Sequence, residues 1–180
     1  LIFGGILVAS IFYIKQRKIE FKNTFIDIIN DVDFNTERTK WQLKFAFVTT
    51  SAIMIGEFLH IPRAMWIGIA CMSVFHPDKS QLQIRYKQRM LYMVLGCLMY
   101  MSIYFLIPQQ FRGLIGLIGG VMIGFSGTYK WQTVFNAFGA LSAATPILGF
   151  GGAIIFRILN NVFGALYSKG FDYIINFIDN

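Results

Sequence analysis

Two arginines occupy matching places in two similar apolar stretches of the chain. The stretch Arg89–Leu98 resembles Arg157–Leu166, with Arg, Leu, Val, Gly and Leu in register 68 residues apart. Each arginine lies near the start of an apolar segment, where the free N–H groups and the dipole of a helix already favour an anion. The pair therefore predicts a site for an anion, and we expect an organic one.

Other polar or small residues continue from each arginine along one helix face. Seven residues make almost two helical turns, so Gly96 and Gly164 lie on the same faces as their arginines. A polar stripe on a membrane helix faces the interior of the bundle or a water-filled cavity. The predicted substrate contacts are Arg157, Arg89, Asn160, Asn161, Gly96, Gly164 and Tyr100.

Both arginines also have a structural interpretation. Their side chains can reach lipid headgroups, while the glycines allow close helix packing. For Arg89, with Arg85 and Lys87 nearby, the sequence favours the headgroup interpretation. For Arg157, which two asparagines follow closely, it favours contact with an anion.

Glu57 is the only acidic residue inside an apolar segment, and His60 and Arg63 follow it. Its carboxylate is the candidate carrier of a coupling proton. The favoured alternative is an ion pair with Arg63 or Arg157. No Gly-rich phosphate loop, paired carboxylates or Cys/His cluster is present in the sequence. We therefore expect neither an enzyme nor a bound cofactor or metal ion.

The composition indicates that these residues lie in membrane helices. Of 180 residues, 56% are hydrophobic and 14% are charged, against about 25% charged in soluble domains. The net charge of +7 belongs to loops beside apolar segments, so we expect no nucleic acid as a partner. Six apolar segments follow: Leu43–Leu59, Ala64–Phe75, Met90–Ile107, Leu114–Phe125, Trp131–Leu148 and Ala153–Ser168.

The predicted fold class is an all-α integral membrane bundle of six short transmembrane helices. Several segments are shorter than the roughly 20 residues that cross the hydrocarbon core, and one contains Pro146. Such helices are tolerated where they are buried in protein or line a cavity. Three tryptophans at or near segment ends are predicted interfacial anchors: Trp41, Trp66 and Trp131.

The basic residues predict the orientation. With the start of Leu43–Leu59 inside, thirteen Lys and Arg residues fall inside, and only Arg63, Arg112 and Arg157 fall outside. This bias predicts a multi-pass protein of the inner cell membrane with a cytoplasmic C-terminus.

The two similar stretches predict an internal repeat. Upstream of them, Ser73-x-x-x-Pro77 matches Ser142-x-x-x-Pro146. The offset spans three helices, an odd number, so the copies are inverted in the membrane, a 3+3 plan that recurs in transporters. Arg89 is then expected at the cytoplasmic end and Arg157 at the outer end.

The N-terminal part divides into two predicted regions. Residues 1–14 are apolar and stop at a basic run, as the tail of a preceding transmembrane helix would. Residues 15–41 carry an apolar stripe from Phe21 to Val32, which predicts a cytoplasmic amphipathic linker that lies on the membrane surface or packs on protein. Asn35 and Thr36 can cap the next helix, with Glu37 in its first turn. The membrane domain is expected to cover residues 42–180.

Several of these features resemble the fusaric acid resistance-like (FUSC, aromatic acid exporter) membrane domain. The resemblance rests on Trp66-Ile67 in a short second helix, on Gln88-Arg89 with Gly96, and on Arg157 with Gly164. It covers roughly residue 38 to the C-terminus, and the aluminium-activated malate transporters look like distant relatives. The chain departs from the pattern by Pro62-Arg63 before the tryptophan.

The resemblance implies export or conductance of carboxylate anions, often by dimeric or duplicated bundles. We therefore expect a transporter or channel, and specifically an exporter, for organic carboxylates, aromatic ones among them. The expected partners are the substrate anion, membrane lipid, and a second copy or second bundle of the same protein. The alternative is a non-transporting membrane module that scaffolds a partner protein or a lipid-processing complex.

Overall fold

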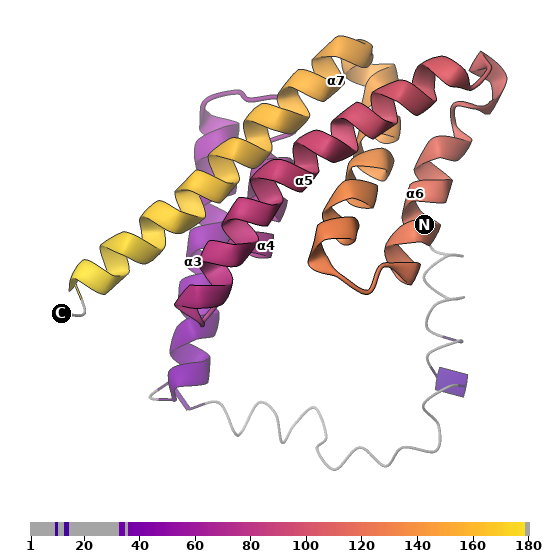
Figure 1. Cartoon of the computed structure of the whole chain (residues 1–180). Helices are drawn as coiled ribbons and strands as arrows, with labels where there is room; N and C mark the ends of the chain where they lie inside the picture. The colour runs from indigo at the N-terminus through magenta and orange to yellow at the C-terminus, as the bar shows by residue number, and fades with distance from the viewer. Residues whose placement is uncertain (1–9, 11–12, 15–32, 35, 179–180) are drawn as a thin grey trace. The chain divides into compact units, whose positions relative to one another are not determined.

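The chain is all-helical in the part that the structure describes. This computed structural model describes residues 10, 13–14, 33–34 and 36–178, which form two compact units, 1–40 and 41–180. The described residues contain five α-helices, a short 3-10 helix at Gln109–Phe111 and no strand. The α-helices are α3 (Glu37–Phe58), α4 (Met65–Val74), α5 (Lys79–Leu106), α6 (Leu114–Phe125) and α7 (Tyr129–Ile178) (Figure 1).

Helix α7 is broken at Gly149, which has a φ of 71° and a ψ of 164°. Glycine adopts this left-handed backbone without the steric penalty of a side chain. Pro146, which lacks an N–H, weakens the helix just before the break. Figure 1 shows the orange and yellow arms of α7 meeting at the top of the view and diverging from there. The arms contain the predicted segments Trp131–Leu148 and Ala153–Ser168.

Two predicted segment boundaries are wrong. Helix α5 begins at Lys79, not near Met90, so the basic residues of the expected loop belong to its first turns. Its N-cap is Asp78, whose carboxylate accepts the Ser80 N–H at 2.8 Å. Hydrogen bonds from Ser80 lower the pKa of the Asp78 carboxyl. The second arm of α7 likewise continues beyond Ser168. Hydrophobicity marks only the apolar part of a helix, whereas backbone hydrogen bonds continue past it.

Helix α3 begins where the capping residues predicted. The Thr36 hydroxyl accepts the Thr39 N–H at 3.3 Å, and Glu37 lies in the first turn. Of the remaining N-terminal predictions, the tail at 1–14 and the stripe Phe21–Val32 lie largely or wholly outside the described residues, as does Asn35.

Within residues 41–180, α7 packs against α4, α5 and α6. One buried cluster joins α4, α5, α6 and α7 around Tyr100 and Phe138. A second joins α3, α4, the first turns of α5 and the later part of α7 around Ile67 and Val74. Nearly every element therefore contacts one of the arms of α7.

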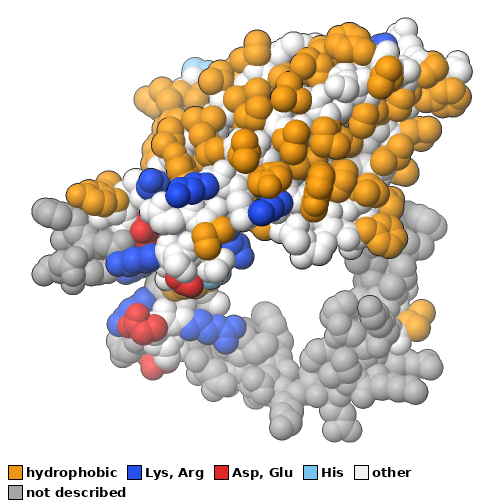
Figure 2. All heavy atoms as spheres, viewed as in Figure 1, with side chains coloured by type: hydrophobic (Ala, Val, Ile, Leu, Met, Phe, Trp, Pro, Cys, Tyr) orange, Lys and Arg blue, Asp and Glu red, His pale blue; other side chains and the backbone are white. Residues whose placement is uncertain are grey.

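Among the described residues, two helices are long and apolar enough to cross a membrane: α5, and Tyr129–Ile175 in α7. Helices α4 and α6 are shorter apolar helices. Figure 2 shows hydrophobic side chains spread over one face, with Lys and Arg side chains along its lower border. This distribution is typical of a protein surrounded by lipid.

Candidate anion site

Arg157, on the second arm of α7, is almost completely buried, with 1% of its surface exposed. Its guanidinium carbon lies 5.0 Å from the centroid of the Trp66 ring, a cation–π contact. Among the described residues, neither its Nε nor its Nη1 has a hydrogen-bond partner. A buried guanidinium with unused donors is costly unless something else pairs with it.

Trp66 contributes to this site and is not an interfacial anchor. Its side chain, at the start of α4, is buried beneath Arg157. The sequence missed this contact because Trp66 and Arg157 are far apart in the chain. Trp131 is half exposed, as a residue at a membrane boundary would be.

Arg89 is buried as well, so the headgroup interpretation of this residue is wrong. Its Nε donates to the Asn161 side-chain oxygen at 2.9 Å, and the Asn161 amide donates to the Arg157 carbonyl at 2.7 Å. One asparagine therefore links the Arg89 side chain to the backbone at Arg157, so the two residues lie near each other instead of at opposite ends of the bundle.

No carboxylate balances these two charges in the part of the chain that the structure describes. An ion pair between Lys40 and Glu37, at 3.0 Å, involves neither arginine. Glu57 is exposed, and the expected ion pair with Arg63 or Arg157 is not formed. The Nη2 of Arg89 also has no partner among the described residues. The two buried guanidinium groups therefore favour an anion at this place.

Asn160 holds the loop between α3 and α4. Its amide donates to the carbonyls of Pro62 at 2.9 Å and Arg63 at 3.0 Å. This loop contains two non-glycine residues with positive φ, His60 at 53° and Arg63 at 60°. Such conformations need support from their surroundings. The contacts of Asn160 thus favour a positioning role, and its contact with substrate stays a prediction.

The two predicted glycines lie where helices approach closely. A Cβ on Gly96 would lie 2.7 Å from the Val134 carbonyl oxygen, and one on Gly164 would collide with the Ile67 carbonyl. This geometry favours the close-packing interpretation. Neither backbone has room beside it for a ligand at these contacts.

Tyr100 lies farther along α5 and is buried. Its hydroxyl hydrogen-bonds with the Thr145 hydroxyl at 3.2 Å. It lines a cavity of about 210 Å³ that also contains Arg112. The sequence did not single out Arg112 beyond its place on the outer side.

A third cation, Arg85, lies near the start of α5, with its guanidinium carbon 5.4 Å from the Tyr129 ring centroid. The Tyr129 hydroxyl donates to Ser73 at 3.1 Å. The sequence did not identify Tyr129 as a site residue, although its partner Ser73 belongs to the repeated pattern. Arginine and tyrosine side chains thus follow one another along α5, from Arg85 through Arg89 to Tyr100.

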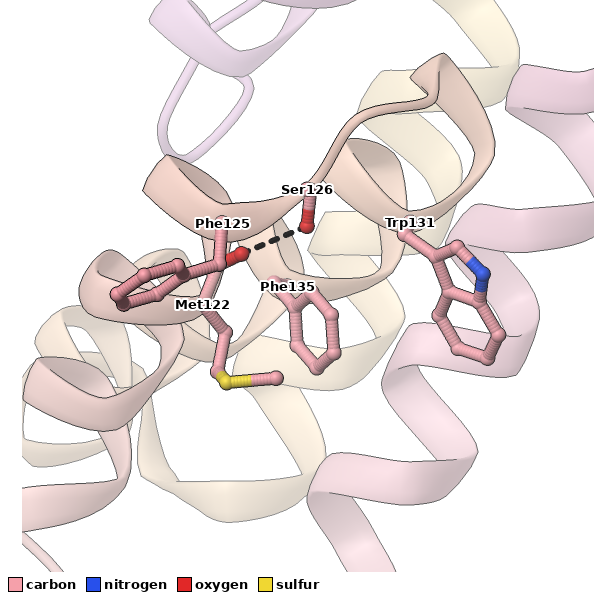
Figure 3. Close-up of a pocket in the computed structure, with 5 residues that line it drawn as sticks. All are labelled: Met122, Phe125, Ser126, Trp131 and Phe135. Atoms are coloured by element: carbon pink, nitrogen blue, oxygen red, sulfur yellow. Dashed lines mark hydrogen bonds between the residues drawn. The ribbon is translucent and has the colours of Figure 1, made fainter.

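A further pocket of about 270 Å³ lies between the end of α6 and the start of α7. Figure 3 shows its lining, which is Met122, Phe125, Ser126, Trp131 and Phe135. The Ser126 hydroxyl donates to the Met122 carbonyl at 2.6 Å. No cation lines this pocket, so it is a poor candidate for the anion. Across the described residues, no group of three His, Cys, Asp or Glu side chains could hold a metal ion.

The region that contains both arginines matches the model of a known protein family. The model of the family described as fusaric acid resistance protein-like matches residues 51–168. The chain belongs to this family. It is a family of membrane transport proteins, and the matched region includes Trp66, Arg89, Asn161 and Arg157. No curated protein and no solved structure gives a significant match.

Proposed function

We propose that the chain is a transporter or channel for organic carboxylate anions, aromatic ones among them, and that it works as an exporter. Arg157 and Arg89 are the main contacts of the anion. Membership of a membrane transport family supports the general function. The proposal adds the charge of the substrate and the residues that meet it.

The unpaired buried charge of the arginines carries the proposal. Arg157 keeps two unused donor atoms beneath the surface, and Arg89 keeps one. A planar guanidinium matches the two oxygens of a carboxylate. An entering carboxylate would supply both the missing charge and the missing hydrogen bonds.

We also propose that the membrane domain is an inverted repeat of three and three helices. The break at Gly149 divides α7 into two arms, which makes six helical segments with α3 to α6. The glycine contacts support the repeat, because Gly96 packs on Val134 and Ala137, whereas Gly164 packs on Ile67 and Ala70. Each contact maps onto the other at an offset of 67 or 68 residues.

The proposed setting is the inner cell membrane, with the C-terminus in the cytoplasm. The partner is a second copy of the chain or a second bundle of the same protein. Support comes from exposed large apolar side chains on α5 and α6, among them Leu98, Leu117 and Phe125. Lipid and a second bundle would share this surface. Glu57 stays the candidate for proton coupling.

The alternative, a non-transporting scaffold, predicts two arginines with no polar connection between them. The hydrogen bond from Arg89 to Asn161, one helical turn after Arg157, argues against it.

A flux assay with Arg157→Gln tests the proposal. Liposomes with the wild-type protein should pass radiolabelled benzoate at neutral pH well above protein-free liposomes. Loss of a charged hydrogen-bonding group should lower this flux at least about tenfold. Arg38→Gln, at an exposed arginine at the start of α3, is the control and should keep full flux. Equal flux in both variants, at equal incorporation and thermal stability, would contradict the role of Arg157.

A further inference from the structure

A second cationic cavity lies where α5 ends, α6 begins and the first arm of α7 ends. It has a volume of about 210 Å³, and its lining includes Tyr100, Tyr104, Arg112, Ser142, Thr145 and Pro146. It is built from residues other than Arg89, Asn161 and Arg157. The residue with the formal charge in this lining is Arg112, so the cavity favours an anion.

Arg112 has unused binding capacity. Its guanidinium carbon lies 4.2 Å from the Tyr104 ring centroid, so the tyrosine holds the cation by its face. Its Nε is buried and has no hydrogen-bond partner among the described residues. A cation–π contact leaves the edge of the guanidinium, where the N–H groups point, available to a carboxylate.

The hydroxyl groups that line the cavity also include one without a hydrogen-bond partner. The Ser142 Oγ is buried without a partner in the described structure. Thr145 Oγ1 bonds to its own helix at the Leu141 carbonyl, at 2.7 Å, and meets the Tyr100 hydroxyl. Ser142 can therefore donate to a second oxygen of a ligand.

The rings at the cavity favour a ligand that is itself aromatic. The Tyr100 and Tyr104 centroids are 5.8 Å apart at an interplanar angle of 35°. The ring centroid of Phe150, just beyond the break of α7, lies 4.5 Å from that of Tyr104. Offset and edge-to-face contacts between rings act at these distances. The volume is below the roughly 300–1,000 Å³ of pockets for drug-sized ligands, so it suits a single ring.

The cavity lies beside the break in α7. Pro146 is part of its lining, and Gly149 with positive φ follows three residues later. Interrupted membrane helices are the segments that form binding sites in transporters. The position of the break thus gives a second reason to expect a ligand here.

We propose that this cavity is a separate binding site for one small aromatic carboxylate. The carboxylate binds Arg112 and Ser142, and the ring packs on Tyr100 and Tyr104. Binding here does not depend on the Arg89–Arg157 site. A role for this cavity as a binding site on the outer side during transport rests on the proposed function.

Equilibrium binding of radiolabelled benzoate to the purified protein in detergent tests the proposal. The Arg157→Gln protein, which lacks the main anion contact, should still bind one benzoate per chain. Adding Arg112→Gln to it should weaken that binding at least about tenfold, whereas adding Arg38→Gln should leave it unchanged. Equal affinity in the two double variants would overturn the proposal.

Two further measurements separate this ligand from other anions. Tyr104→Leu in the Arg157→Gln protein should weaken benzoate binding about fivefold while leaving acetate binding unchanged. Arg112→Lys keeps the charge without the planar fork and should retain part of the affinity, which distinguishes lost recognition from a lost fold. Displacement of benzoate by an equal concentration of glycerol 3-phosphate would identify a site for lipid headgroups and overturn the proposal.

The two proposals fail in different ways. Benzoate binding that depends on Arg112, together with full flux in Arg157→Gln, would contradict the role of Arg157 in the proposed function and leave the second site standing. Flux that depends on Arg157, together with binding unaffected by Arg112→Gln, would contradict only the second site.

Discussion

Asn161 is the residue that makes the two buried arginines one site. It accepts from Arg89 and donates to the Arg157 carbonyl, so a single side chain connects α5 with the second arm of α7. An asparagine can do both because its amide has an acceptor and two donors. A carboxylate in its place would have neutralised the positive charge. The neutral asparagine orients Arg89 and leaves the charge for a ligand.

Asn161→Ala should destabilise the protein. It leaves the buried Arg89 Nε without a partner, which costs about 1–3 kcal/mol. Thermal unfolding in detergent should show a lower Tm than for wild type. Ser102→Ala is the control, because the exposed Ser102 hydroxyl bonds only to its own helix, at the Leu98 carbonyl. Equal Tm values for the two variants would show that Asn161 is not required to hold Arg89.

At the scale of elements, glycines set how closely the helices approach. Gly164 brings the second arm of α7 onto α4, and Gly96 brings α5 onto the first arm. Close approach without a side chain between the backbones is the usual basis of helix packing in membranes. The Gly164 contact joins the same two elements, α4 and the second arm of α7, that bring Trp66 and Arg157 together.

Gly164→Ala should therefore weaken the contact between α4 and α7. The new Cβ would collide with the Ile67 carbonyl, which belongs to the backbone and cannot rotate away. Such overpacking costs about 1–3 kcal/mol, measurable as a lower midpoint of denaturant unfolding. Gly120→Ala is the matched control in α6, where the added Cβ would meet no atom within 4 Å. It should be neutral or stabilising by up to about 1 kcal/mol. The opposite order of stabilities would contradict this packing role.

At the scale of the whole molecule, the basic residues and the apolar surface predict how the protein lies in the membrane. Lys87, on the first turns of α5, is exposed, as is Gln110 beyond the other end of that helix. Because α5 is long and apolar enough to cross a membrane, these two residues should lie on opposite sides. The positive-inside rule assigns Lys87 to the cytoplasm.

Cysteine labelling in intact cells tests this orientation. A maleimide that cannot cross membranes should modify Gln110→Cys from outside, and should modify Lys87→Cys only after the cells are permeabilised. The wild-type protein is the control, since Cys71 and Cys97 are buried and should not react. Labelling of Lys87→Cys in intact cells would reverse the proposed orientation.

The sequence by itself determined the helical class, the membrane character and the family, because apolar runs and their spacing are local properties of a chain. It also identified Arg89, Arg157 and Asn161 as candidate site residues through the repeat. Only the tertiary structure decided what these residues contact. Arg89 reaches Asn161 across 72 residues of sequence, and Trp66 and Arg112 joined the cationic sites through contacts between helices. Hydrophobic pattern does not encode which helix faces which, and that pairing decides whether an arginine meets lipid, a carboxylate or another arginine.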